Sequence, residues 1–208
     1  MIIYFIRHGQ TDYNLKSLIQ GNNDIPLNET GLKQAEETRD LLLSKGITYE
    51  RIYCSPLDRA LTTCEIVSGK KRDSFIIDKR LEEINVGDLA HTSMLVDDPY
   101  TIDFIKHPDR FVPHPGAESY QDMIDRVGSF LDDLKREQPA EKILVACHRG
   151  PIQSVVMNLD KTIPLKEFRR ITIPNASCLE VELKDGVYKV TNLYKNDNNI
   201  LQDESLFF

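Results

Sequence analysis

Residues 2–11 read Ile2-Ile3-Tyr4-Phe5-Ile6-Arg7-His8-Gly9-Gln10-Thr11, an apolar run that ends abruptly in polar residues. A short continuous apolar run with β-branched side chains is typical of a strand buried on both faces. The apolar run 143–147 has the same form and leads directly into His148-Arg149-Gly150. Because sites form at the carboxyl ends of parallel strands, the two stretches predict a parallel sheet with a polar site at one edge.

Strand and helix patterns alternate through much of the remaining chain. Short apolar runs predict further strands at 52–54 and 75–77. Apolar residues spaced three and four apart predict helices over 31–44, 57–67, 120–136 and 151–159. Asn28 or Thr30 is expected to cap the first helix. The alternation predicts an α/β fold, a three-layer sandwich in which helices flank a mainly parallel central sheet.

Near the end of the chain, Lys184-Asp185-Gly186 separates two alternating apolar runs, 178–183 and 187–193. Asp-Gly between such runs is a strong hairpin signal, so we expect a C-terminal antiparallel hairpin at the edge of the sheet. A chain of 208 residues can bury a self-sufficient core. We therefore expect residues 1–208 to form one domain.

Two stretches do not fit the alternation. Residues 11–28 are expected to form a polar loop. Residues 88–118 hold four of the ten prolines, and we expect them to form a lid-like insertion with a short helix around 100–106. Three of the five histidines also lie there and are interpreted as surface or loop residues: His91, His107 and His114. Residues 202–208 are expected to be a frayed tail, although 206–208 could dock on a neighbour.

The composition limits the classes of partner and compartment. With 26 Lys and Arg against 33 Asp and Glu, the formal net charge is −7, which argues against nucleic acid or an anionic membrane as a partner. No apolar run approaches the roughly 20 residues of a membrane span, and the N-terminus has no signal-peptide pattern. Four cysteines without paired spacing favour reduced thiols. We expect a cytoplasmic protein.

Four predicted strand ends bring reactive side chains toward one edge of the sheet. A neutral imidazole is a good nucleophile toward phosphorus, and guanidinium groups bind phosphate oxygens. A carboxylic acid can protonate a departing alkoxide. The set indicates phosphoryl transfer, which depends on positioning and charge stabilisation. We expect no cofactor and no metal, because the histidines have no third ligand at metal-site spacing. These residues are Arg7 and His8, Arg59, Glu82 and Glu83, and His148 and Arg149.

Six sequence blocks then occur in a recognisable order. They are Arg7 to Thr11 with Asn14, Gln20-Gly21 with 24–27 and 31–35, 55–60 with Thr63, Leu81-Glu82-Glu83 with Gly87, 115–119, and 145–148. In this order they resemble the histidine phosphatase superfamily, in its cofactor-dependent phosphoglycerate mutase-like branch. The resemblance runs along nearly the whole chain, and six ordered blocks are far more specific than one short motif.

The resemblance implies roles for the matching residues. His8 would be the nucleophile that becomes phosphorylated. Glu83 would be the proton donor, with Glu82 as the rival acid. The phosphate pocket would be formed by Arg7, Arg59 and His148.

Further substrate contacts are implied for Asn14, Gln20 and Gly21. Asn14 could instead only cap a turn. Glu118-Ser119 could be only a helix start, because serine is a good N-cap.

The chain departs from the family pattern at three places. After Gly87 many relatives continue with an aromatic or small residue and then Glu-Gly, but here Asp88-Leu89-Ala90-His91 follows, which bears on substrate preference and not on the chemistry. The second histidine is usually followed by glycine, but here by Arg149, which could reach the phosphate, recruit a second anionic group or point to solvent. Phosphoglycerate mutases follow their acid with Arg-His-Tyr and carry an arginine pair in the insertion. Here Ile84-Asn85-Val86 follows the acid, and the insertion offers only separated Lys106 and Arg110.

The missing mutase features favour a metal-independent phosphatase that hydrolyses a small phosphomonoester through a phosphohistidine. The alternatives are a phosphoglycerate mutase that needs a bisphosphorylated cofactor and a catalytically silent phospho-ligand-binding module. The expected partner is a small phosphoester substrate. The sequence leaves the identity of that substrate and the oligomeric state open.

Overall fold

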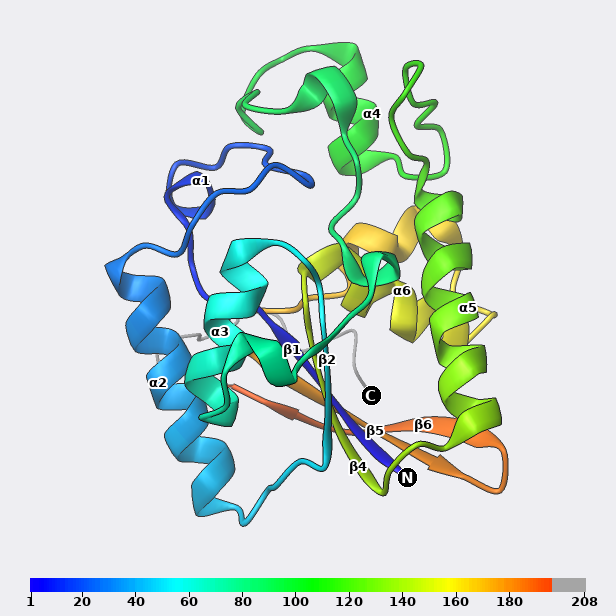
Figure 1. The fold of residues 1–208 in the computed structure, drawn as a ribbon. Helices are drawn as coiled ribbons and strands as arrows, with labels where there is room; N and C mark the ends of the chain where they lie inside the picture. The colour runs from blue at the N-terminus through cyan, green and yellow to red at the C-terminus, as the bar shows by residue number, and fades with distance from the viewer. Residues whose placement is uncertain (196–208) are drawn as a thin grey trace.

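The computed structural model describes residues 1–195, which build a six-stranded sheet between two layers of helices (Figure 1). The strand order is β3-β2-β4-β1-β5-β6. The first four of these run parallel, and β5 and β6 are antiparallel to their neighbours. The strands are β1 Ile2–Arg7, β2 Arg51–Cys54, β3 Ile76–Ile77, β4 Lys142–Cys147, β5 Cys178–Lys184 and β6 Val187–Tyr194. The predicted three-layer α/β fold is confirmed.

Helices cover the two faces of the sheet as two pairs. Helices α2 (Glu29–Ser44) and α3 (Asp58–Ser68) cover one face, and α5 (Tyr120–Glu137) and α6 (Arg149–Leu159) cover the other. The central strands are buried on both sides because Phe5 and Ile6 point into opposite core clusters. Helix α4 (Pro99–Lys106) lies beyond the carboxyl ends of the strands (Figure 1).

The register of β1 and β4 brings the two histidine segments together. Arg7, the last residue of β1, pairs with Cys147, the last residue of β4. The backbone N–H of His8 then donates to the carbonyl of Cys147 at 3.1 Å. His8 and His148 therefore leave the sheet at the same level.

Helix boundaries differ from the predictions by one or two residues, most at the starts of α2 and α6. Helix α2 begins at Glu29, because Asn28 is its N-cap and accepts a hydrogen bond from the Gly31 N–H at 2.9 Å. Helix α6 begins at Arg149 and not at 151, so proline occupies its first turn, where a missing N–H costs nothing. Ser119 caps α5 as expected, through a capping box with Asp122.

The first of the two irregular stretches contains more structure than the sequence indicated. The polar stretch 11–28 holds the one-turn helix α1 (Asp12–Leu15), whose capping box joins Thr11 and Asn14. The segment 88–118 holds α4 at the predicted place, and its action as a lid stays a prediction. Four short 3₁₀ helices complete the elements of residues 1–195: η1 Arg72–Ser74, η2 Lys79–Leu81, η3 Gly87–Leu89 and η4 Leu165–Arg170.

The C-terminal hairpin turns at Asp185-Gly186, and both residues have positive φ, at 50° and 76°. This is the backbone of the tight hairpin turn that Asp-Gly favours. The predicted tail at 202–208 lies outside the described residues. Cys54, Cys64, Cys147 and Cys178 are all free and buried. Within residues 1–195, no helix is long and apolar enough to cross a membrane.

A close backbone approach fixes the segment that follows β1. A Cβ added to Gly9 would contact the carbonyl of Gly31, and a Cβ added to Gly31 would contact the backbone of Gln10. Both glycines are therefore needed to seat the segment after His8 against the first turn of α2.

Candidate active site

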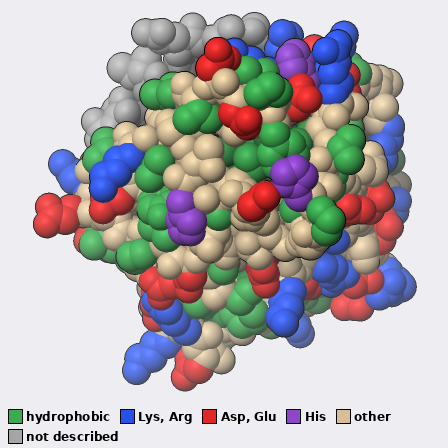
Figure 2. Space-filling model, turned by 90° about the horizontal axis from the view of Figure 1, so that it is seen from above, with side chains coloured by type: hydrophobic (Ala, Val, Ile, Leu, Met, Phe, Trp, Pro, Cys, Tyr) green, Lys and Arg blue, Asp and Glu red, His purple; other side chains and the backbone are tan. Residues whose placement is uncertain are grey.

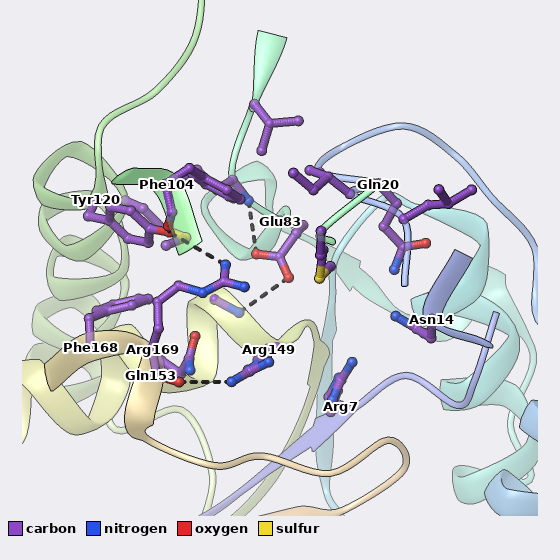
Figure 3. A pocket seen from close by; sticks show the side chains of 18 of the residues that line it. Arg7, Asn14, Gln20, Glu83, Phe104, Tyr120, Arg149, Gln153, Phe168 and Arg169 are labelled. Carbon is purple, nitrogen blue, oxygen red and sulfur yellow. Dashed lines mark hydrogen bonds between the residues drawn. The ribbon is translucent and has the colours of Figure 1, made fainter. Parts of the chain in front are cut away.

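A cavity of about 290 Å³ lies at the carboxyl ends of β1 and β4. Its walls come from the ends of these strands, from the segments 14–21 and 83–86, and from α4, α5, α6 and η4 (Figure 3). Predicted site residues that line it are Arg7, His8, Asn14, Gln20, Gly21, Glu83 and Arg149. Segments far apart in the sequence thus meet at the edge where the predictions put the site.

His8 is buried, with 1% of its surface exposed. Its Nδ1 lies 2.7 Å from the carbonyl oxygen of Gly9. Because a carbonyl oxygen can only accept, Nδ1 carries the proton and the neutral ring keeps an unprotonated Nε2. Burial, together with the charges of Arg59 and Arg7, holds the pKa of His8 well below 6.5. The ring is therefore neutral near pH 7.

His148 lies beside His8, with ring centroids 5.1 Å apart. Its Nδ1 accepts a hydrogen bond from Nε of Arg59 at 3.2 Å. In the neutral ring, Nε2 therefore carries the proton and donates to the hydroxyl of Ser55 at 2.7 Å. Burial and the charge of Arg59 hold the pKa of His148 well below its ordinary value. Both nitrogens of this ring have protein partners.

Arg59 is fully buried, and its guanidinium also binds the segment 21–23. One terminal nitrogen donates to the carbonyl of Gly21 at 2.7 Å, and the other donates to the carbonyl of Asn23 at 2.5 Å. Burial lowers the pKa of Arg59 to about 10, so it keeps its charge near neutral pH. Arg59 and His148 lie behind the cavity wall, and the cavity lining within residues 1–195 does not include them.

Arg7 brings a charge directly to the cavity from the end of β1. Its Nη1 donates to the carbonyl of Ile173 at 2.6 Å. Its buried Nε has no hydrogen-bond partner within residues 1–195. Burial, together with the charge of Arg149, lowers the pKa of Arg7 to about 9, and the group remains protonated near pH 7.

Glu83 faces the cavity from the segment after η2. Its Oε1 accepts from the Ile84 N–H at 3.0 Å, and its Oε2 accepts from the Gly150 N–H at 3.2 Å (Figure 3). A Cβ on Gly150 would contact the Glu83 carboxylate, so the glycine after Arg149 makes room for this acid. Glu82 lines only an outer pocket, which Glu83 also borders, so within residues 1–195 Glu83 is the carboxylate that lines the cavity.

Asn14 and Gln20 lie on the opposite side of the cavity from Arg149 and are joined through Thr11 (Figure 3). The Oδ1 of Asn14 accepts from the Thr11 N–H at 3.1 Å and from Nδ2 of Asn175 at 3.2 Å. Oε1 of Gln20 accepts from the Thr11 hydroxyl at 3.0 Å. Asn14 thus caps the turn of α1 and also lines the cavity, so its two sequence interpretations are compatible.

Arg149 does not point to solvent. Its side chain lines the cavity, and its Nη2 donates to the carbonyl of Arg169 at 2.9 Å (Figure 3). Nothing local in the sequence marks the residues around Arg149 on α4, α5, α6 and η4 as part of the site. These are Phe104, Tyr120, Gln153, Phe168 and Arg169.

The outer surface above α1 and α4 carries a different mixture of side chains from the arginine-rich cavity. Histidine, acidic and hydrophobic side chains lie near its centre, and lysine and arginine lie mainly toward its rim (Figure 2). The three histidines of the segment 88–118 do not line the cavity: His91 contacts Tyr13, His114 contacts Asp88, and His107 lines another pocket. Among residues 1–195 no cluster of three His, Cys, Asp or Glu is arranged to hold a metal ion.

The family model described as histidine phosphatase superfamily (branch 1) matches residues 3–196. The chain belongs to the histidine phosphatase superfamily. A 2,3-bisphosphoglycerate-dependent phosphoglycerate mutase of Rhizobium meliloti is 36% identical to this chain over 169 residues, which cover 76% of this chain and 79% of the mutase.

Two further relatives cover more of the chain. An uncharacterised phosphatase, PhoE, of Bacillus subtilis is 26% identical over 196 residues, which cover 94% of this chain and 95% of PhoE. The structure of Bacillus stearothermophilus YhfR superimposes with a TM-score of 0.80 at 27% identity, covering 91% of this chain and 94% of YhfR. Phosphatases and mutases both occur among the relatives of the chain.

Proposed function

We propose that this chain is a metal-independent phosphatase that hydrolyses a small phosphomonoester through a phosphohistidine at His8. The observation that carries the proposal is the hydrogen bond from Nδ1 of His8 to the Gly9 carbonyl, which leaves an unprotonated Nε2 on a neutral ring. Arg7 and Glu83 line the same cavity. A nucleophile, a cation and an acid are the groups that phosphoryl transfer requires.

In the first step, Nε2 of His8 attacks phosphorus and the bond from phosphorus to the ester oxygen breaks. The protonated Glu83 carboxyl gives its proton to the departing oxygen, so the alcohol leaves neutral and Glu83 becomes a carboxylate. The charge of Arg7 stabilises the phosphoryl oxygens as negative charge develops on them. The products of this step are the alcohol and phosphorylated His8.

In the second step, the Glu83 carboxylate takes a proton from a water molecule whose oxygen attacks phosphorus. The bond from phosphorus to Nε2 breaks, inorganic phosphate leaves, and His8 and Glu83 return to their starting states. Arg59 and His148 support the His8 side of the pocket with charge and packing. A phosphate that reaches them would compete with the hydrogen bonds that join Arg59 to His148 and His148 to Ser55. We assign substrate contacts to Asn14, Gln20 and Gly21 on the opposite wall.

Trapping the intermediate tests this proposal. Protein purified in a chelator is mixed with para-nitrophenyl phosphate and quenched, and peptides are analysed by mass spectrometry. We expect one phosphoryl group on the peptide that contains His8, and its absence in His8→Ala together with the loss of turnover. Near-normal hydrolysis by His8→Ala in chelator would refute the mechanism. Failure of the wild-type protein to accept a phosphoryl group from any member of a broad phosphoester panel would favour a silent binding module.

A phosphoglycerate mutase is the second candidate, because a relative at 36% identity carries that name. Such an enzyme keeps the phosphoryl group on the protein until a second substrate hydroxyl accepts it. Mixing the chain with phosphoglycerate and a bisphosphorylated cofactor separates the candidates. Release of inorganic phosphate without isomer exchange supports hydrolysis, and fast isomer exchange supports the mutase.

A further inference from the structure

Two arginines that line the cavity have no role in the proposed reaction. Arg149 follows the second histidine, and Arg169 lies near the end of η4. Figure 3 shows both guanidinium groups pointing into the cavity, with Arg7 between Arg149 and Asn14. The cavity therefore presents cations on more than one side.

Aromatic side chains orient Arg169. Its guanidinium carbon lies 5.0 Å from the centre of the Phe104 ring, a cation–π distance. Its Nη1 also lies 3.4 Å from the hydroxyl of Tyr120, which itself donates to the carbonyl of Phe104 at 2.6 Å. An arginine held against aromatic rings loses little further freedom when an anion binds.

Arg149 has bonding capacity that the protein does not use. One of its nitrogens binds the carbonyl of Arg169, and its buried Nε has no hydrogen-bond partner within residues 1–195. Within the same residues, neither Arg149 nor Arg169 forms an ion pair with a carboxylate. A purely structural arginine at this place would be expected to satisfy its buried donors and charge with protein groups.

The positive charge of the arginines that line the cavity exceeds the negative charge of a single phosphate group. Three arginines line the cavity, Arg7, Arg149 and Arg169, and they supply three positive charges. The proposed reaction begins with Glu83 protonated, so this group adds no charge when the substrate binds. Burial lowers the pKa of Arg149 to about 10, so this group too stays charged near pH 7. A phosphomonoester dianion neutralises two of the three charges. One positive charge remains for another anionic group.

We propose that Arg149 and Arg169 form a second anion subsite, and that the substrate is a phosphomonoester carrying a second anionic group within reach of them. The proposal rests on the proposed function, because it assigns the transferred phosphoryl group to His8 and Arg7. Both a carboxylate and a second phosphate offer the paired oxygens that a guanidinium binds. Of the three interpretations that the sequence left open for Arg149, the structure favours the recruitment of a second anion.

Hydrolysis of matched esters tests the subsite. The substrates are propyl phosphate, its ω-carboxylate analogue and its ω-phosphate analogue, and butyl esters repeat the series one carbon longer. We expect wild-type kcat/KM to be higher for at least one doubly anionic ester than for its parent. Arg149→Gln and Arg169→Gln should each lower that value about 30-fold while changing propyl phosphate by less than about threefold. The preferred ω-group then distinguishes a carboxylate from a second phosphate.

The control variant is Arg170→Gln, because Arg170 neighbours Arg169 in sequence but pairs with Glu167 at the surface and has 70% of its side chain exposed. It should leave both classes of ester unchanged. Arg149→Lys should recover part of the lost preference, since it restores the charge but not the paired donors. An equal loss for the parent and doubly anionic esters in Arg149→Gln would refute the subsite.

Equilibrium binding separates this proposal from the proposed function. Alkylphosphonates cannot be hydrolysed, so calorimetric titration of propyl- and butylphosphonate and their ω-carboxylate and ω-phosphonate analogues needs no turnover. Tighter binding of a doubly anionic compound to wild type than to Arg149→Gln would support the subsite even if no phosphohistidine formed. Equal affinities, or no binding of any of them, would refute it even if His8 were phosphorylated by simple esters.

Discussion

Replacing Glu83 by glutamine separates the two chemical steps of the proposed reaction. The amide has nearly the size of the carboxyl group but cannot supply a proton. It also keeps one acceptor oxygen for two backbone donors, the N–H groups of Ile84 and Gly150. Because the side chain is only half-buried, losing one of these hydrogen bonds should lower the free energy of unfolding by about 1 kcal/mol. The variant should therefore fold.

The expected rate effect depends on the leaving group. An alkyl phosphate releases a strongly basic alkoxide, so Glu83→Gln should lower its kcat/KM by about 10²- to 10⁴-fold, the usual contribution of a general acid. The nitrophenolate ion leaves without a proton, and kcat/KM for para-nitrophenyl phosphate should fall by less than about tenfold. Because the amide that replaces the carboxylate cannot deprotonate water in the second step, phosphorylated His8 should then accumulate.

Stopped-flow absorbance measures this difference directly. With para-nitrophenyl phosphate, the variant should release about one equivalent of nitrophenolate in a burst, followed by slow turnover. The control is Glu82→Gln, since this neighbouring carboxylate lines the outer pocket and not the cavity. It should stay within about threefold of wild type on both substrates. Equal losses on alkyl and nitrophenyl esters, or a stronger effect in Glu82→Gln, would contradict the assignment of Glu83 as the acid.

Three further perturbations probe the groups around the cavity. Burial and nearby arginines hold the pKa values of His8 and His148 well below 6.5 in the folded protein, so below pH 6.5 the unfolded chain binds protons that the folded protein does not. Urea unfolding should therefore show the free energy of unfolding falling below pH 6.5 by up to about 1.4 kcal/mol per histidine per pH unit. A flat profile down to about pH 5.5 would contradict this. Gly31→Ala should lower the free energy of unfolding by about 1–3 kcal/mol and reduce turnover, because the new Cβ would contact the backbone of Gln10; an unchanged urea midpoint would argue against the close approach. Ser55→Ala should lower the free energy of unfolding by about 1–3 kcal/mol and lower kcat, because it leaves the His148 Nε2–H without its acceptor. An unchanged free energy of unfolding would mean that the ring has another partner.

Much of the fold and part of the site followed from local sequence patterns. Continuous apolar runs identified β1 and β4, Asp-Gly identified the hairpin, and a three- and four-residue repeat identified α5. Such patterns are local because side chains alternate along a strand and recur on one face of a helix. Since the carboxyl ends of parallel strands share one edge, the same patterns also predicted that the residues after β1 and β4 would meet.

The tertiary structure decided which groups face the cavity. The sequence could not choose among three orientations of Arg149, and it gave no sign of Arg169 or of Ser55 as a partner of His148. Ser55 and His148 lie 93 positions apart and meet only because β2 and β4 are neighbours in the sheet. Arg169 lies on a 3₁₀ helix, an element too short to leave a periodic pattern. Short-range patterns determine the strands and their ends, but contacts between distant segments determine which side chains surround the substrate.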